Sequence, residues 1–209
     1  MVRMGEGVVV VDYDPAWPSL FRGIGADLRG ELGDVAVRID HIGSTAVVGL
    51  AAKPVIDAQV SVTSFEPLLR YRDPIERAGF VHRSDNTERT KRYFRERPGA
   101  RRTHVHVRRV GSFSEQFALL FRDYLRVHAG RADDYARLKR ALADRYPGAA
   151  ERHRYVEAKV PFVCGPSTSR TTGPRELAGS LRHRTRDQGD FLVGSRLLVP
   201  CPCAGESRW

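Results

Sequence analysis

Apolar residues recur along this chain with two different spacings, one typical of helices and the other of strands. From residue 14 to 32 they recur every three or four positions, as on one face of an amphipathic helix. Asp14 and Pro15 are typical of the start of such a helix. The same spacing predicts helices in four later segments: 64–78, with a break or kink at Pro74, 113–128, 132–146 and 149–160.

Short segments rich in β-branched and aromatic residues lie between these helices and predict strands. We expect strands at 35–41, 54–62, 80–83, 92–96 and 102–110, and a further short strand-like run at 8–13. The order of elements predicts an α+β fold. It consists of a mixed or antiparallel sheet of about five strands with helices on one face, followed by C-terminal helices.

The chain divides into two parts by composition. Residues 1–165 have the periodicity of a folded domain, whereas residues 166–209 are rich in arginine, lack lysine and show little periodicity. We expect this tail to be disordered or weakly docked. Of the three cysteines, Cys201 and Cys203 lie in the tail, and three are too few for a disulfide framework or a four-ligand metal site.

The segment 41–57 carries the strongest chemical signal. Small residues after a strand, here Gly43 and Ser44, let backbone N–H groups approach an anion closely. Ser44 and Thr45 add hydroxyl donors, and Lys53 adds a charge suited to phosphate. Asp57 lies in an apolar strand, where a carboxylate needs a metal, a cation or hydrogen bonds to offset its desolvation. The turn and the aspartate together predict a phosphate-and-metal site.

Strand alternation brings further polar residues to the same place. Side chains two positions apart share a face, so Asp57 and Gln59 lie on one face of their strand, and His104 and His106 share a face of another. If the valines between them form the core, all four polar residues look out of one open face. Imidazole favours Zn, Mn, Fe or Ni over Mg, so the pattern predicts a divalent metal site at Asp57, His104 and His106.

The sequence His-Ile-Gly-Ser-Thr-Ala-Val-Val-Gly-Leu-Ala-Ala-Lys-Pro-Val-Ile-Asp, residues 41–57, resembles the GrpB family of the nucleotidyltransferase superfamily, which has a polymerase-beta-like fold. It departs at Val48, where the family usually has Pro. Further matching pieces are Asp14-Pro15-Ala16-Trp17, Thr103-His104-Val105-His106-Val107 and Phe121-Arg122-Asp123-Tyr124-Leu125-Arg126, together with Tyr135, Lys139, Tyr155 and Lys159. The resemblance implies a nucleotidyltransferase-like fold over about residues 8–165 and a nucleotide-binding cleft.

The resemblance leaves three interpretations of the function open. A standard nucleotidyltransferase holds two Mg²⁺ ions with three strand carboxylates, but Gln59 stands at the second carboxylate position and His104 and His106 near the third. One interpretation is a divergent nucleotidyltransferase that uses Asp57 with Mg, Mn or Zn and a histidine as ligand or general base. The second is a non-catalytic nucleotide- or phosphoester-binding module. The third is a metal-dependent hydrolase or lyase.

Secondary candidates have weaker support. Arg92 either meets a phosphate or lies on a solvated edge. Tyr155 and Lys159 are one helical turn apart and either reach the cleft or close the core. We expect Arg122 and Asp123 to form a structural ion pair, and His41 to orient the turn by a hydrogen bond.

Charge and hydropathy limit the classes of partner. The net charge of +10 attracts polyanions, but no nucleic-acid-binding motif accompanies it. We therefore expect a nucleotide or a small phosphorylated ligand, with nucleic acid as an alternative partner. The chain has neither an apolar run of membrane-spanning length nor a signal-peptide pattern, which together with the few cysteines predicts a cytoplasmic protein without a membrane partner. The oligomeric state is not predicted.

Overall fold

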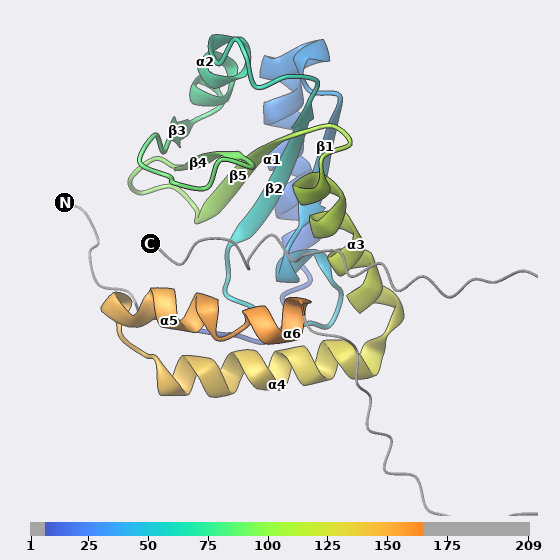
Figure 1. Ribbon diagram of the computed structural model, residues 1–209, viewed down its shortest axis with the longest axis vertical. Helices are drawn as coiled ribbons and strands as arrows, with labels where there is room; N and C mark the ends of the chain where they lie inside the picture. The colour runs from blue at the N-terminus through green and yellow to red at the C-terminus, as the bar shows by residue number, and fades with distance from the viewer. Residues whose placement is uncertain (1–6, 165–209) are drawn as a thin grey trace, which may run out of the picture.

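The computed structural model describes residues 7–164, so the predicted tail at 166–209 lies outside the described residues. Its centre is a five-stranded mixed sheet in the order β1-β2-β5-β4-β3 (Figure 1). Only β2 and β5 run parallel, and the other neighbours are antiparallel. The strands are β1 (Arg38–Ile42), β2 (Ile56–Val62), β3 (Phe80–His82), β4 (Arg92–Glu96) and β5 (Thr103–Arg109). The predicted α+β class and mixed sheet are confirmed.

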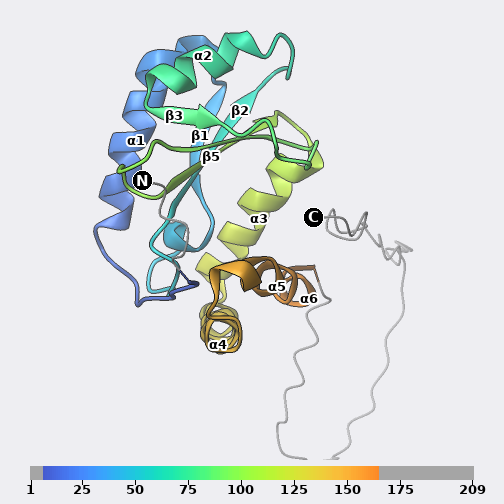
Figure 2. The ribbon, with the colours of Figure 1, turned by 90° about the vertical axis from the view of Figure 1, so that its left-hand side faces the viewer.

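Helices surround the sheet in three groups (Figures 1 and 2). On one face lie α1 (Trp17–Leu32) and α2 (Leu69–Arg77), whereas α3 (Phe113–Val127) crosses the other face. A separate helical layer lies at one end of the sheet and consists of α4 (Ala129–Arg145), α5 (Arg152–Glu157) and α6 (Val160–Cys164). Within residues 7–164, no helix has both the length and the apolar character to span a membrane.

Several element boundaries differ from those predicted. The run at 8–13 forms a single bridge, Val11 to Ala52, rather than a strand. The first helix begins at Trp17, because Asp14 accepts a hydrogen bond from the Ala16 amide in the turn before it. Pro74 lies inside α2 and does not end it. Cys164, at the end of α6, is disulfide-bonded, which the cysteine count did not predict.

Short 3-10 segments explain two of the remaining shifts. Residues Gly33–Val35 form the 3-10 segment η1, so the strand predicted from residue 35 begins only at Arg38. The last predicted helix divides into the 3-10 segment η3 (Ala149–Glu151), then α5, then α6.

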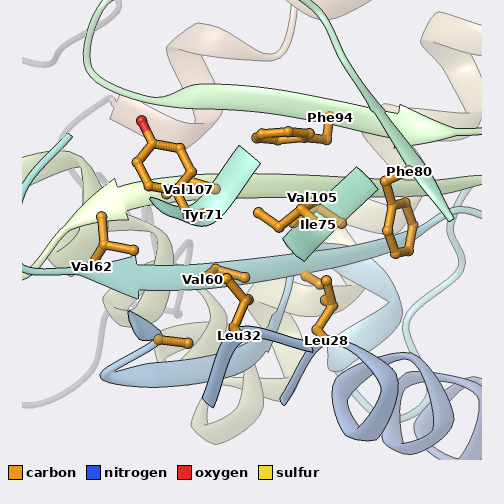
Figure 3. Packing of buried hydrophobic residues seen from close by; sticks show 12 residues of the cluster. Leu28, Leu32, Val60, Val62, Tyr71, Ile75, Phe80, Phe94, Val105 and Val107 are labelled. Atoms are coloured by element: carbon orange, nitrogen blue, oxygen red, sulfur yellow. The ribbon is translucent and has the colours of Figure 1, made fainter. Parts of the chain in front are cut away.

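The main core lies between the sheet and the α1–α2 face (Figure 3). Alternate residues of the two central strands point into it, as predicted from the valine spacing: Ala58, Val60 and Val62 from β2, and Val105 and Val107 from β5. They pack against Leu28 and Leu32 of α1, Tyr71 and Ile75 of α2, and the β4 residue Phe94. Burial of these side chains fixes the strand register, because a one-residue slip would expose all of them.

The opposite face of the sheet is only partly open, because α3 covers one end of it. The buried Glu115 of α3 accepts hydrogen bonds from the Ser61 hydroxyl at 2.6 Å and from the Gly111 amide at 2.7 Å. The Gln59 amide group reaches the Glu115 backbone carbonyl at 3.5 Å. The sequence did not predict a helix on this face. The open part is consequently reduced to the end of β2 and β5 that carries Asp57.

We expect Glu115→Ala to lower the free energy of unfolding by about 2–4 kcal/mol, because it leaves the buried Ser61 hydroxyl without an acceptor and removes the hydrogen bond from the Gly111 N–H. Urea denaturation measures this change. Leu120→Ala is the control, since the Leu120 side chain is exposed on the same helix. A loss for Glu115→Ala no larger than that of the control would show that Glu115 does not anchor α3.

Candidate functional site

Asp57, His104 and His106 converge on the open part of the sheet. The parallel pairing of β2 and β5 places Asp57 directly opposite His104, and Gln59 opposite His106. Asp57 Oδ1 lies 3.1 Å from His104 Nδ1 and 3.2 Å from His106 Nε2. One potential ligand atom from each of the three side chains lies within 4.8 Å of the others, and each side chain keeps part of its surface exposed. The predicted cluster is therefore assembled in space.

Asp57 and His106 differ in charge at neutral pH. Burial opposes ionisation of Asp57, but the hydrogen bonds from both imidazoles outweigh it and hold the pKa of this carboxyl well below its usual range. Burial lowers the pKa of His106 to about 3, although Asp57 acts to raise it. At neutral pH the site thus contains a carboxylate beside an uncharged His106, which is the protonation state that a metal ligand requires.

The Gly-Ser turn between β1 and β2 packs directly against Asp57. Gly43 has a φ of +72°, and a Cβ at this position would lie 2.7 Å from Asp57 Oδ2. Both the backbone conformation and the contact therefore require glycine. The 3-10 segment η2 (Ser44–Ala46) follows, and the amide groups of Ser44 and Thr45 have no hydrogen-bond acceptor among the described residues.

A chain of hydrogen bonds through His41, Thr45 and Val55 fixes the shape of this turn. His41 Nε2 lies 3.0 Å from Thr45 Oγ1, and the Thr45 hydroxyl donates to the Val55 carbonyl at 3.2 Å. Phe21 stacks on the His41 ring, with centroids 4.6 Å apart. Burial lowers the pKa of His41 to about 4, so the ring is uncharged. His41 orients the turn as predicted, whereas the hydroxyl of Thr45 is used inside the protein.

Two arginines of α3 hold the turn from the other side. The Arg122 guanidinium pairs with Asp123, as predicted, and also donates to the His41 carbonyl at 3.0 Å. Arg126 donates two hydrogen bonds to the Ala46 carbonyl, at 2.8 and 3.1 Å. These contacts, which the sequence did not predict, fix the backbone immediately before and after the Gly-Ser turn.

Two of the expected residues do not reach the open site. Gln59 shares a face with Asp57 but is fully buried under α3, where it accepts a hydrogen bond of 2.6 Å from Arg108. Arg92 lies opposite the core residue Val107 in β4, so its side chain points to the α2 face and stacks on Phe65. Tyr93 and Arg95 are the β4 residues on the site face, and the Tyr93 ring lies 5.3 Å from that of His106.

Three lysines meet beside the turn, between the sheet and the helical layer. Lys53 and Lys159 lie over the same Tyr155 ring, with their amines 5.3 and 4.6 Å from its centroid. Lys139 of α4 donates to the Ala51 carbonyl. Burial, with a smaller effect of the neighbouring lysines, lowers the pKa of Lys139 to about 7 and that of Lys159 to about 8. Lys139 has no predicted role, because only tertiary packing brings α4 to this position.

Comparison with known proteins identifies the family. Residues 7–165 match the family described as GrpB protein. The chain belongs to the GrpB family. A crystal structure of the GrpB protein from Enterococcus faecalis has 31% sequence identity and a TM-score of 0.63, and the match covers 74% of this chain and 97% of that one.

Segments of longer curated proteins are similar to this chain. The UPF0157 protein YqkA of Bacillus subtilis is 33% identical over 156 residues, which cover 75% of this chain and 45% of YqkA. A dephospho-CoA kinase of Mycobacterium tuberculosis is 36% identical over 178 residues, covering 73% of this chain and 43% of the kinase. The chain thus spans less than half the length of these two curated relatives.

The lysines give this GrpB-family chain a pH-dependent stability. Because the folded state lowers the pKa of Lys139 to about 7, the unfolded chain binds more protons above that pH, and stability rises with pH. We expect this lysine to contribute up to about 1.4 kcal/mol per pH unit to the unfolding free energy between pH 8 and 10. Lys139→Met should remove that contribution, as measured by urea denaturation across this range.

The control for this slope is Arg137→Met, on the exposed side of the same helix, which should leave the pH dependence unchanged. Equal slopes in Lys139→Met and the wild-type protein would show that Lys139 keeps its proton in the folded state.

Proposed function

We propose that this GrpB-family chain binds a nucleotide or a similar phosphate ester together with one divalent metal ion, and that it is a divergent metal-dependent nucleotidyltransferase. The observation that carries the proposal is the contact between Gly43 and Asp57. The Gly-Ser turn lies directly against a carboxylate that also meets two imidazoles, which supports an anion site at the turn beside a metal site. A phosphate group held by the turn would therefore lie beside a bound metal.

The turn supplies the groups that bind phosphate. Within residues 7–164 the backbone amides of Ser44 and Thr45 have no hydrogen-bond acceptor, and Ser44 is partly exposed. Backbone N–H groups of this kind form anion-binding concavities. Lys53 and Lys159 add positive charge on the side of the helical layer. We include Gly43, Ser44, Thr45 through its amide, Lys53 and Lys159 in the phosphate site, and exclude Arg92 because of its orientation.

The side chains of Asp57, His104 and His106 fit one metal ion in kind and spacing. One carboxylate and two imidazoles favour Mn²⁺ or Zn²⁺ over Mg²⁺. A bound ion would act as a Lewis acid on a phosphoryl oxygen and activate the attacking oxygen. The protein's own contribution is to fix the three ligands on two paired strands and to hold the phosphate with the turn. Gln59, which stands at the position of a second carboxylate, is an uncharged side chain buried under α3, so it does not add a ligand for a second ion.

Hydrolysis is a second candidate, favoured by the two imidazoles in the ligand set, because such sites often activate water. The two reactions differ in their products. Incubation with ATP and Mn²⁺ gives pyrophosphate and a nucleotidylated acceptor in the first case, and free nucleotide without an acceptor requirement in the second. A protein that binds ATP and metal but turns over neither way is a binding module.

Asp57→Asn tests the metal site. We expect the Mn²⁺ dissociation constant to rise at least about 100-fold, because the variant loses the only charged ligand of the three. The unfolding free energy should fall by less than about 2 kcal/mol, since the amide oxygen still accepts hydrogen bonds from the imidazoles. Calorimetric metal titration and urea denaturation measure the two quantities, and Asp123→Asn, on exposed α3 surface, is the control. Wild-type metal affinity in Asp57→Asn would rule out the metal role.

Lys53→Ala tests the phosphate site without touching the metal ligands. We expect the variant to weaken ATP binding by about 1–3 kcal/mol, because it loses a hydrogen bond between the Lys53 ammonium group and a charged phosphate. Isothermal calorimetry in the absence of metal measures the difference, with Arg101→Ala at an exposed position as the control. Equal affinities of Lys53→Ala and wild type would place the phosphate elsewhere.

A further inference from the structure

The loop that joins β3 to β4 encloses a cavity that the proposed nucleotide and metal site does not use. Its volume is about 460 Å³, and residues of the segment 82–93 line it. A cavity of this size holds a small organic molecule. Most of its lining residues are polar or charged, which suits a polar ligand. We call it the loop cavity.

Hydrogen bonds fix the loop around this cavity. The Arg83 amide donates to the Tyr93 carbonyl at 2.8 Å and so closes the base of the loop. The Asn86 amide donates to the Arg83 carbonyl at 3.1 Å and shapes the turn above that base. On one side, the Ser114 hydroxyl of α3 donates to the Thr90 carbonyl at 3.1 Å, which ties the loop to the helix. The cavity is therefore formed before any ligand arrives.

Cationic side chains outnumber carboxylates in the lining. The groups that carry a permanent charge are four cations and two carboxylates: Arg83, Arg89, Lys91 and Arg92 against Asp85 and Glu88. Two of the cations are neutralised within the loop itself. Arg83 pairs with Asp85 at 2.7 Å. Lys91 pairs with Glu88.

The other two cations differ in their surroundings. Arg92 stacks on Phe65 and lies 3.7 Å from a carboxylate oxygen of Glu66, outside the cavity. Arg89 is exposed and forms no ion pair with any residue in the range 7–164. Its guanidinium group is therefore available to an anionic group of a ligand, for which arginine has the matching geometry.

Two lining residues connect the loop cavity to the candidate metal cluster. The Tyr93 ring lies 5.4 Å from that of His104 and 5.3 Å from that of His106, measured between centroids. The Lys91 amine lies 5.6 Å from the centroid of the same tyrosine ring. Burial is the main cause of the low pKa of His106, and the charge of Lys91 adds to this effect. A molecule in the cavity would consequently lie next to the cluster.

The loop cavity and the Gly-Ser turn lie on opposite sides of the cluster. In the strand order β1-β2-β5-β4-β3, the turn joins the first two strands, and the loop joins the last two (Figure 1). The cluster lies between them, on β2 and β5. Displacement at a phosphoryl group requires the attacking and leaving oxygens to be roughly in line, on opposite sides of the phosphorus. With the phosphate chain on the side of the turn, the attacking group comes from the side of the loop cavity.

We propose that the loop cavity binds the nucleotidyl acceptor, and that this acceptor is a small molecule with a hydroxyl group and an anionic group, either phosphate or carboxylate. The inference rests on the proposed function for the nucleotide and adds the class of the second substrate. In the transfer, the acceptor hydroxyl oxygen forms a bond to the α-phosphorus of the nucleotide. The bond from that phosphorus to the pyrophosphate oxygen breaks, and the hydroxyl proton leaves to solvent. Arg89 holds the anionic group of the acceptor.

A loop whose charges serve only its own stability makes a different prediction. The pairs of Arg83 with Asp85 and of Lys91 with Glu88 hold the loop together without any ligand. Arg89 takes part in neither pair. Its replacement should therefore change ligand binding without changing stability, whereas a purely structural loop predicts no binding of small anions at all.

The test is calorimetric titration of the full chain, saturated with ATP in the absence of divalent metal, so that the nucleotide site is filled. Ribose 5-phosphate and gluconate are the anionic probes, and ribose is the neutral probe. We expect an anionic probe to bind at least about tenfold more tightly than ribose, because only the anion forms a charge-assisted hydrogen bond. The anionic probe with the higher affinity identifies the preferred group.

Arg89→Glu should weaken binding of that probe at least about tenfold, because a repulsive charge replaces an attractive one. Its affinity for ATP and its thermal midpoint should stay unchanged. Arg70→Glu is the matched control, since it makes the same charge change at an exposed position of α2, away from the cavity. It should bind the probe as tightly as the wild-type protein.

Amide chemical shifts in NMR spectra locate the bound probe without any substitution. The signals of Asn86 and Thr87 should move on addition of the probe. Those of Gly43 and Ser44 should not, because ATP already occupies the turn. If ATP binds but neither anionic probe does, if Arg89→Glu keeps the wild-type probe affinity, or if the loop signals stay in place, the inference is overturned while the proposed function stands. If ATP itself does not bind, both fail.

Discussion

The parallel pairing of β2 with β5 is the constraint on which the site depends. It is the only parallel contact in the sheet, and it sets Asp57 opposite His104 with His106 one step further along. The valines between these residues face a core that tolerates no slip of register. The stability of the fold and the geometry of the site therefore depend on the same pairing. The core side chains lie on one face of the two strands, and the site residues lie on the other face.

The surroundings of this pair show how the chain tolerates charges away from water. The Asp57 carboxylate is stabilised by two imidazole hydrogen bonds. The turn that touches it is held by the hydrogen bond of His41 to Thr45 and by the hydrogen bonds of Arg122 and Arg126 to backbone carbonyls. The lysines on the other side receive aromatic faces and a backbone carbonyl but no carboxylate within residues 7–164. Such an arrangement sacrifices folding stability for a local positive potential, which is common at binding sites.

The sequence predicted those features that follow from local spacing. The faces of β2 and β5 were correct because alternation of valine with polar residues has a single solution once the core side is chosen. The contact of Asp57 with the two histidines followed from this choice. The starts of β1 and α1 were wrong by a few residues, because a 3-10 segment at Gly33–Val35 and the Asp14 turn leave no periodic signal.

Features that depend on distant packing were not predictable in the same way. The face to which Arg92 points depends on its pairing with Val107, which no local pattern specifies. Lys139 and Arg126 act through carbonyls 88 and 80 positions away in the chain. Glu115 reads as an ordinary polar residue of an amphipathic helix, but it is buried against β2. The resemblance to a family identified several of these positions, but it assigned them no contacts.

Gln59 shows that a sequence position and its accessibility are separate properties. In the strand pattern it stands where a second metal-binding carboxylate would be expected, and a single substitution to Glu would restore that pattern. In the fold, however, this side chain lies under α3 and its oxygen accepts from Arg108 at 2.6 Å. A carboxylate there would form an ion pair with that arginine instead of facing a metal. Replacing Gln59 with a carboxylate would therefore not create a second metal site unless α3 were also displaced.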